Sequence, residues 1–354
     1  MMRTTGTSAR MALRPPTIRE SPADGKSSSA DLQPRSPAHL DGLDRALIEL
    51  LLKDGKITNR ELSLRTNISE SAVGTRLRKL ATSGTVAFSA VIDWETVGFE
   101  WLVIARVKTC ARSPGEVAED VAALGQCVQA AVTLGSHDVV AHFLVTDRTE
   151  LRKLTSEGLP AIEGISSIDI DVATETTVTP NGQKGFIAKC PPAIPLPAPK
   201  IELDDLDVAI LQELIDDGRQ SSRKIARSHH VSEGTVRARV NRLTQAGLVR
   251  VVAMVHPSAL GLGGAIANVA MRIDRSRIED IKAQLEAMPE LLFVATCVGS
   301  VDVSFVATAT NTQHLIELVS RQVQTIEGVR STDILIMVDM VLASPYMKRF
   351  DTTG

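Results

Sequence analysis

Two segments of the sequence place basic residues at helical spacing, a combination that suits binding to DNA. They lie at residues 69–80 and 232–243, and each carries three cations: Arg76, Arg78 and Lys79 in the first, Arg237, Arg239 and Arg242 in the second. Such cations on an exposed helix face can neutralise phosphates and, where geometry allows, pair with guanine edges. Ser69 and Ser232 stand where each helix would take its N-cap, and Thr235 follows in the first turn. These nine residues are candidate DNA contacts; the alternative is a charged face that is merely solvated.

Both segments belong to a long internal repeat. Leu-Asp-Gly-Leu-Asp at residues 40–44 recurs as Leu-Asp-Asp-Leu-Asp at residues 203–207. After one inserted residue the alignment resumes, so that Gly-Ser-His-Asp at 135–138 meets Gly-Ser-Val-Asp at 299–302. A repeat of this length indicates two tandem units rather than a solenoid, whose repeats span ~20–50 residues.

The first part of each unit has the pattern of three helices. Apolar residues at helical spacing predict a first helix that stops at an Asp-Gly pair, Asp54-Gly55 or Asp217-Gly218. The pattern then predicts a second helix at 59–65 or 222–228, and a third from Ser69 to Gly84 or from Ser232 to Gly247. Three helices with a tight turn between the last two form a motif that lays its final helix in the major groove. More cations lie nearby: Lys56, Arg60, Arg65, Arg219, Arg223, Lys224 and Arg227.

The first copy of this motif is expected to bind DNA less tightly than the second. Gly74 stands where the second copy has Arg237. A glycine inside a helix costs about 1 kcal/mol relative to alanine, and the cation is lost as well.

The second part of each unit alternates strand and helix patterns in the order βαββαβ. The expected strands are 101–108, 128–134, 139–145 and 167–173 in the first unit, and 266–273, 292–298, 303–308 and 332–341 in the second. The expected helices are 115–124 and 149–162, and 277–287 and 312–326. This order is the ferredoxin-like α+β arrangement, which leaves one sheet face uncovered. We expect that face to be buried against the sister domain, in the same chain or another.

The predicted domain organisation follows from these patterns. Residues 1–39 form a disordered, mildly basic arm, residues 180–200 a proline-rich extended linker, and residues 344–354 a tail. Between them lie a helix-turn-helix at 40–98 and a ferredoxin-like domain at 99–179, then a second helix-turn-helix at 201–261 and a second ferredoxin-like domain at 262–343.

Whole-chain composition argues against several other classes of protein. No segment approaches the ~20 apolar residues of a membrane span, and the N-terminus lacks a signal-peptide core. The four cysteines are scattered without a C-x-x-C pair, which argues against a thiolate zinc site. We predict a cytoplasmic protein with no membrane association, no catalytic residues, no metal site and no cofactor.

These motifs together resemble the Lrp/AsnC, or feast/famine, family of prokaryotic transcription regulators, duplicated within one polypeptide. The resemblance covers residues 40–343 and rests on four motifs found in both copies. They are the Leu-Asp-x-x-Asp opening, the helix-turn-helix, the Leu-Ser-x-x-x-Val-x-x-Arg helix and the Gly-x-x-Asp turn, with Ile68 and Val231 at the leucine position of the third.

The resemblance implies an effector domain that senses amino acids or related metabolites near the Gly-x-x-Asp turn. The residues carried over are Gly135, Ser136, His137 and Asp138 in the first copy, and Gly299, Ser300 and Asp302 in the second. Glycine permits close approach of a ligand, and a carboxylate can accept hydrogen bonds from an ammonium group. The alternative is an ordinary turn in which the aspartate caps its own loop.

The resulting hypothesis is a sequence-specific DNA-binding regulator whose DNA binding is modulated by a small molecule. The sensing domains are expected to pair face to face, as a pseudo-dimer within the chain or in a homo-oligomer, and so to space the two reading helices on double-stranded DNA. One alternative is an architectural DNA-binding protein without an effector. Another is an enzyme like the fused sirohaem decarboxylases, although the His/Tyr/Arg-rich motif of those enzymes is missing and Tyr346 is the single tyrosine.

Overall fold

The computed structural model describes residues 40–83, 85–179, 182, 193–195, 201–255, 264–343 and 349–351. The predicted N-terminal arm, Gly84, most of the predicted linker and most of the predicted tail lie outside the described residues. Two three-residue strands fall within those last two segments. β6 (Ala193–Pro195) and β12 (Arg349–Asp351) pair in parallel.

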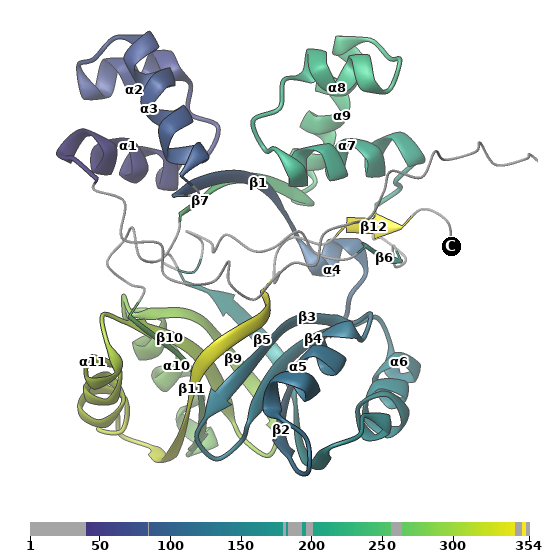
Figure 1. Ribbon diagram of the computed structural model, residues 1–354, viewed down its shortest axis with the longest axis vertical. Coiled ribbons are helices and arrows are strands. Elements are labelled where there is room, and N and C mark those ends of the chain that lie inside the picture. Colours follow the sequence, from purple (N-terminus) through teal and green to yellow (C-terminus); the bar gives the residue numbers. More distant parts are fainter. Residues whose placement is uncertain are drawn as a thin grey trace, which may run out of the picture. The chain divides into compact units, whose positions relative to one another are not determined.

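Each copy opens with three helices and a strand, in the predicted order (Figure 1). They are α1 (Gly42–Lys53), α2 (Asn59–Thr66), α3 (Glu70–Thr82) and β1 (Val86–Ile92), and then α7 (Asp205–Asp216), α8 (Ser222–Ser228), α9 (Glu233–Gln245) and β7 (Val249–Val255). Ser69 and Ser232 accept backbone N–H bonds in the first turns of α3 and α9, which confirms the predicted N-caps. Asp41 and Asp204 begin α1 and α7 with capping boxes.

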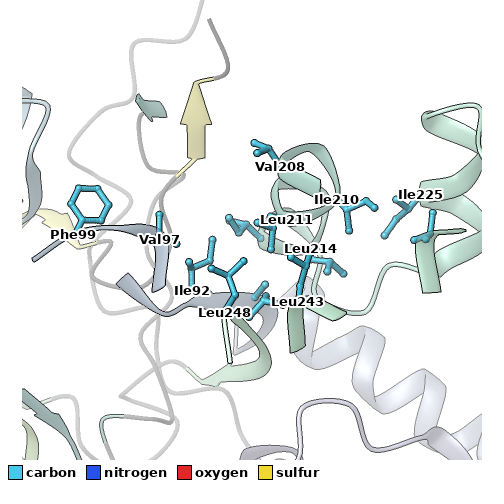
Figure 2. Close-up of a cluster of buried hydrophobic side chains, with 14 of the residues drawn as sticks. Ile92, Val97, Phe99, Val208, Ile210, Leu211, Leu214, Ile225, Leu243 and Leu248 are labelled. Carbon is cyan, nitrogen blue, oxygen red and sulfur yellow. The ribbon is translucent and has the colours of Figure 1, made fainter. Parts of the chain in front are cut away.

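The strands that follow the third helices pair with each other and join the two helix-turn-helix units. β1 and β7 run antiparallel along their whole length, from Val86 opposite Val255 to Ile92 opposite Val249. The strands also exchange core residues. Ile92 packs in the apolar core of the second unit (Figure 2), while Val255 packs in the core of the first. Neither unit therefore completes its core alone.

The close approach of β1 and β7 explains the glycines of the two Asp-Gly pairs better than helix termination does. The first helices do stop there as predicted, but Asp54 and Asp217 are extended C-caps, and neither glycine has a positive φ. A Cβ on Gly55 would lie 2.8 Å from the backbone of Val252, and a Cβ on Gly218 would lie 2.9 Å from the backbone of Ser89. Glycine is needed because the neighbouring strand passes too close for a side chain.

The second half of each unit has the predicted βαββαβ order, preceded in the first copy by α4 (Trp94–Val97). The first copy contains β2 (Trp101–Thr109), α5 (Pro114–Ala123), β3 (Cys127–Leu134), β4 (Val139–Val145), α6 (Arg148–Lys153) and β5 (Ile165–Val178). The second contains β8 (Ala265–Ile273), α10 (Ile278–Glu286), β9 (Leu291–Gly299), β10 (Val303–Ala309), α11 (Thr312–Glu317) and β11 (Val329–Ala343). The ferredoxin-like α+β fold class is confirmed.

The last helix of each domain is shorter than predicted. α6 and α11 pass into π-helical turns at Leu154–Gly158 and Leu318–Val323, and the first of these continues into a 3₁₀ turn at Leu159–Ala161. Apolar spacing is similar in these helix types, so the sequence pattern does not separate them.

The two sheets close into one barrel within a single chain, with strand order β10-β8-β11-β3-β4-β2-β5-β9. Face-to-face packing alone was therefore an incomplete prediction. The last strands run longer than expected, so that β5 also pairs with β9 and β11 also pairs with β3. Pairing satisfies backbone groups that would otherwise be exposed at sheet edges. The uncovered faces meet inside the barrel, where Ile104, Val140, Ala270 and Leu335 are buried together.

Candidate nucleic-acid interface and ligand turns

Each third helix buries one apolar face and exposes the opposite one. Val73, Leu77 and Leu80 of α3 are buried in the core of the first unit, and Val236 and Leu243 of α9 in that of the second. The exposed face of α3 carries Arg78 and Lys79, and that of α9 carries Arg237 and Arg242. The predicted basic face is therefore present on both helices.

Two of the six basic candidates, Arg76 and Arg239, each contact two carboxylates at the start of the first helix and are less than a third exposed. An Nη atom of Arg76 lies 2.7 Å from a carboxylate oxygen of both Asp41 and Asp44. The matching atom of Arg239 lies 2.6 Å from Asp204 and 2.9 Å from Asp207. Hydrogen bonding from Arg239 lowers the pKa of Asp204. These arginines tie the third helix to the start of the first, which gives them a structural function that sequence reasoning missed.

The other four basic candidates are more accessible to a ligand. Arg237 is 68% exposed and its partner is Glu233, one turn earlier on α9. Such exposed pairs contribute little, ~0.5 kcal/mol, so a phosphate can readily replace the carboxylate. Arg242 contacts buried Asp207 but stays 47% exposed. Within the described residues, neither Arg78 nor Lys79 has an ion-pair partner, and both are exposed.

Arg219 has a different function from the one its charge suggested. Its guanidinium lies 4.3 Å from the ring centroid of Phe88, and its Nε donates to the carbonyl of Gly55 at 3.1 Å. Burial lowers its pKa. Arg219 therefore joins the two helix-turn-helix units rather than adding to the exposed basic surface.

The glycine and aspartate of each Gly-Ser-x-Asp turn have structural functions. Asp138 accepts a hydrogen bond from the backbone N–H of Thr109 at 2.7 Å, and Asp302 accepts one from Ile273 at 2.9 Å. Each carboxylate thus fastens its turn to the end of a neighbouring strand. Cβ atoms on Gly135 and Gly299 would lie 2.5 and 2.4 Å from carbonyl oxygens of β11 and β5. The close approach that these glycines allow is that of the other copy's last strand.

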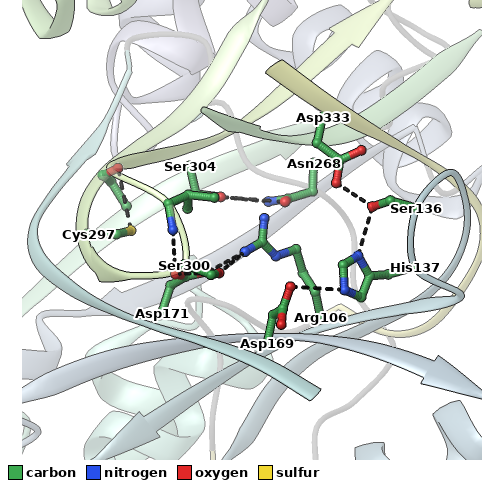
Figure 3. A network of polar contacts seen from close by, with 12 residues as sticks. Arg106, Ser136, His137, Asp169, Asp171, Asn268, Cys297, Ser300, Ser304 and Asp333 are labelled. Carbon is green, nitrogen blue, oxygen red and sulfur yellow. Dashed lines mark hydrogen bonds and ion pairs between the residues drawn. The ribbon is translucent and has the colours of Figure 1, made fainter. Parts of the chain in front are cut away.

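In the first turn, the serine and histidine connect two carboxylates (Figure 3). Ser136 donates to Asp333 of β11 and lies 2.8 Å from Nδ1 of His137. Nε2 of His137 lies 3.2 Å from Asp169 of β5. Burial lowers the pKa of His137, and the Asp169 carboxylate partly opposes that effect. Ser136 is exposed, so a ligand can reach this cluster from solvent.

The second turn meets a buried ion pair instead. Arg106 and Asp171 of the first copy lie 2.6 Å apart and are 3% and 0% exposed. Ser300 and the backbone N–H of Val301 both donate to Asp171 at 3.0 Å (Figure 3). Sequence reasoning did not single out this pair. A signal was available, because the second copy has Ala270 and Leu335 at the positions aligned with this arginine and this aspartate.

The described residues hold no group of three or more His, Cys, Asp or Glu side chains arranged to bind a metal ion. Cys127 and Cys297 are buried, and burial raises the pKa of Cys297 to about 12. Among the described helices, none has the length and apolarity to cross a membrane.

Family models of known proteins match both halves of each copy. A winged helix-turn-helix DNA-binding model matches residues 40–86 and 203–250, and an Lrp/AsnC ligand-binding-domain model matches residues 102–182 and 265–347. An HTH-type transcriptional regulator of Pyrococcus horikoshii, FL11, is 34% identical over 145 residues, which are 40% of this chain and 96% of that protein. Another regulator of that organism, described as uncharacterised, is 32% identical over 142 residues, 40% of this chain and 89% of the relative.

A solved structure resembles the chain over both copies. The siroheme decarboxylase NirDL, in complex with an iron-uroporphyrin III analogue, aligns with a TM-score of 0.62 over 87% of this chain and 94% of that one, at 11% identity. At this identity the likeness concerns the fold alone. The sequence relatives and the paired family models show that the chain belongs to the Lrp/AsnC family, with both family domains present twice.

Proposed function

We propose that this protein is a sequence-specific DNA-binding transcription regulator that carries two reading helices, α3 and α9, on one polypeptide. A small molecule, an amino acid or a related metabolite, modulates its DNA binding. The observation that carries the proposal is the exposed basic face of both third helices, on units that β1 and β7 hold together.

Some basic residues of the reading helices hold the helices in place, and others are exposed to bind DNA. Arg76 and Arg239 hold the helices in place, while Arg78, Lys79, Arg237 and Arg242 provide the DNA contacts. Ser69, Ser232 and Thr235 lie at the helix N-termini, where backbone N–H groups favour phosphate oxygens. Two fixed helices suit two half-sites, and because their cations differ the preferred site is an imperfect palindrome.

The test is DNA binding by Arg237→Gln, on fragments selected from a random pool by the unaltered protein. Loss of a phosphate contact should weaken binding and reduce the slope of log affinity against log salt by about 1. Arg321→Gln removes an exposed arginine from the second sensing domain and serves as the control. Unchanged affinity and salt slope for Arg237→Gln and for a combined Arg78→Gln/Lys79→Gln variant would reject the assigned helices.

The Gly-Ser-His-Asp turn at residues 135–138 suits an effector better than the second turn at residues 299–302. Asp333 and Asp169 present two carboxylates beside exposed Ser136, which suits an ammonium group. At the second turn the Asp171 carboxylate is already paired with Arg106. The effector therefore binds at residues 135–138, and the second turn serves as structure.

This site predicts how effector sensitivity should respond to substitution. In a titration of the common amino acids against DNA binding, Asp333→Asn should abolish the response that the unaltered protein shows. Asp339→Asn, an exposed aspartate on the same strand, should leave it intact. A protein that binds DNA but responds to no amino acid would favour the architectural alternative.

A tetrapyrrole-processing function is the second candidate, favoured by the fold shared with NirDL along most of the chain. Absorption spectra recorded while iron-uroporphyrin is added distinguish the two. A regulator should leave the spectrum of the free porphyrin unchanged, whereas a saturable shift of its main band would favour the enzyme.

A further inference from the structure

A cavity of about 190 Å³ lies between the two sensing domains and the connector that leads into the first, and no residue of either Gly-Ser-x-Asp turn lines it. Its walls come from α4 and the residues after it, from β2, β3, β4 and β5 of the first copy, and from β9 and β10 of the second. None of the seven candidate effector residues lines it. It is therefore separate from the site proposed above.

Four aromatic side chains are among the residues that line this cavity. Trp94 and Trp101, the two tryptophans of the chain, both line it, together with Phe99 and Phe293. Trp94 and Phe99 meet edge to face with ring centroids 5.6 Å apart. A dry cavity of roughly 150 Å³ is known to hold benzene, so this volume suits a single ring with a small substituent.

One of the residues that line the cavity, His142, carries a buried polar atom. His142 is 4% exposed, and its Nε2 has no hydrogen-bond partner in the part of the chain that the structure describes. A buried polar atom left unpaired costs free energy, so such atoms mark places where a ligand group or water belongs. At the aligned position the second copy has Val306, which lines the same cavity and offers no such atom.

Acidic side chains in the cavity wall disfavour a ligand with negative charge. Glu95, Glu100 and Glu175 line the cavity, and no Lys or Arg is among the lining residues that the structure describes. Glu175 is paired with Lys282, while the Glu100 side chain is exposed. An anionic ligand would meet three carboxylates and no cation among the described lining residues, which disfavours it.

We propose that this cavity is a second ligand site, which takes a small uncharged aromatic molecule whose one polar group hydrogen-bonds Nε2 of His142. Its walls include the connector that leads from β1 of the first helix-turn-helix unit into the barrel. A bound ring would therefore contact both the connector and the strands of the barrel.

The test is calorimetric titration of the full-length protein with three molecules of one shape: p-cresol, toluene and p-toluate. We expect p-cresol to bind, toluene to bind about tenfold more weakly, because it makes no hydrogen bond, and p-toluate more weakly still. His142→Val copies the residue that the second copy uses. It should remove the preference for p-cresol over toluene and keep toluene binding, which also shows that the cavity is intact.

Three outcomes would overturn the proposal. They are no binding of p-cresol to the unaltered protein, equal affinities for p-cresol and toluene, or an undiminished preference for p-cresol in His142→Val. None of them depends on DNA, so failure here leaves the proposed regulator function standing.

Discussion

The two copies of the repeat share one fold but differ in where they keep their polar residues. At aligned positions the first copy has Gly74, Arg106, His142 and Asp171, where the second has Arg237, Ala270, Val306 and Leu335. At these positions the first copy carries a buried ion pair and a buried histidine in the barrel, and the second carries the additional exposed arginine on its reading helix.

This difference shows what duplication within one chain permits. In a symmetric homodimer every residue appears at both equivalent places, so one side cannot hold an ion pair while the other holds Ala and Leu. Here the closed barrel fixes which copy occupies which place. The copies can then specialise, the first with a buried ion pair in the barrel and the second with an additional arginine on the reading helix.

The largest expected effect comes from breaking the ion pair that only the first copy contributes. Arg106→Ala leaves the Asp171 carboxylate buried and unpaired, which should lower the free energy of unfolding by about 3–5 kcal/mol. The double variant Arg106→Ala/Asp171→Leu reproduces the pair of residues found in the second copy. It should recover most of the loss, because apolar replacement of a buried pair is often neutral.

Urea unfolding of the full-length protein measures both variants. If the double variant is as unstable as Arg106→Ala, the cost comes from the packing of the arginine side chain rather than from the unpaired charge. The two copies would then differ in shape more than in electrostatics.

A smaller effect is expected from His142, whose aligned residue Val306 cannot titrate. Burial lowers the pKa of His142 to about 4, from about 6.5 when unfolded. Between these values the unfolded chain takes up a proton that the folded chain does not. Stability is therefore complete above about pH 6.5 and falls as the pH drops towards 4, by up to about 3 kcal/mol.

Urea unfolding midpoints at pH 7.5 and pH 5 test this account. In His142→Val the drop between the two conditions should be smaller than in the unaltered protein. Burial also lowers the pKa of His137, so part of the drop should remain. A drop of the same size in both proteins would mean that the pH dependence arises elsewhere.

Sequence patterns predicted the elements of each copy well but not how the copies meet. Helix boundaries and the caps at Ser69 and Ser232 depend on neighbours within a few residues, so spacing alone shows them. The pairing of β1 with β7 and the closure of the barrel depend on contacts between residues more than a hundred positions apart. Spacing carries no information about those contacts.

The candidate site residues show the same difference between what local sequence reveals and what distant contacts decide. Arg76, Arg239 and Arg219 were recognised by charge, but their partners lie on other helices or in the other copy. Arg106 was overlooked because a single polar residue in an apolar strand has no motif. Comparison of aligned positions within the repeat would have revealed it, since its counterpart is Ala270.

The smallest expected effect concerns the reading helices, where Gly74→Arg would give the first copy the arginine of the second. A Cβ at position 74 would have Asn59 Nδ2, 3.7 Å away, as its nearest neighbour, so the helix accepts a side chain without strain. Replacing a mid-helix glycine should also stabilise the first unit, by up to about 1 kcal/mol. One added phosphate contact should tighten DNA binding several-fold and steepen the salt slope by about 1.

Gly74→Ala separates the two contributions, because it stabilises the helix without adding charge. If Gly74→Ala tightens DNA binding as much as Gly74→Arg, then helix stability rather than a missing cation makes the first copy the weaker reader.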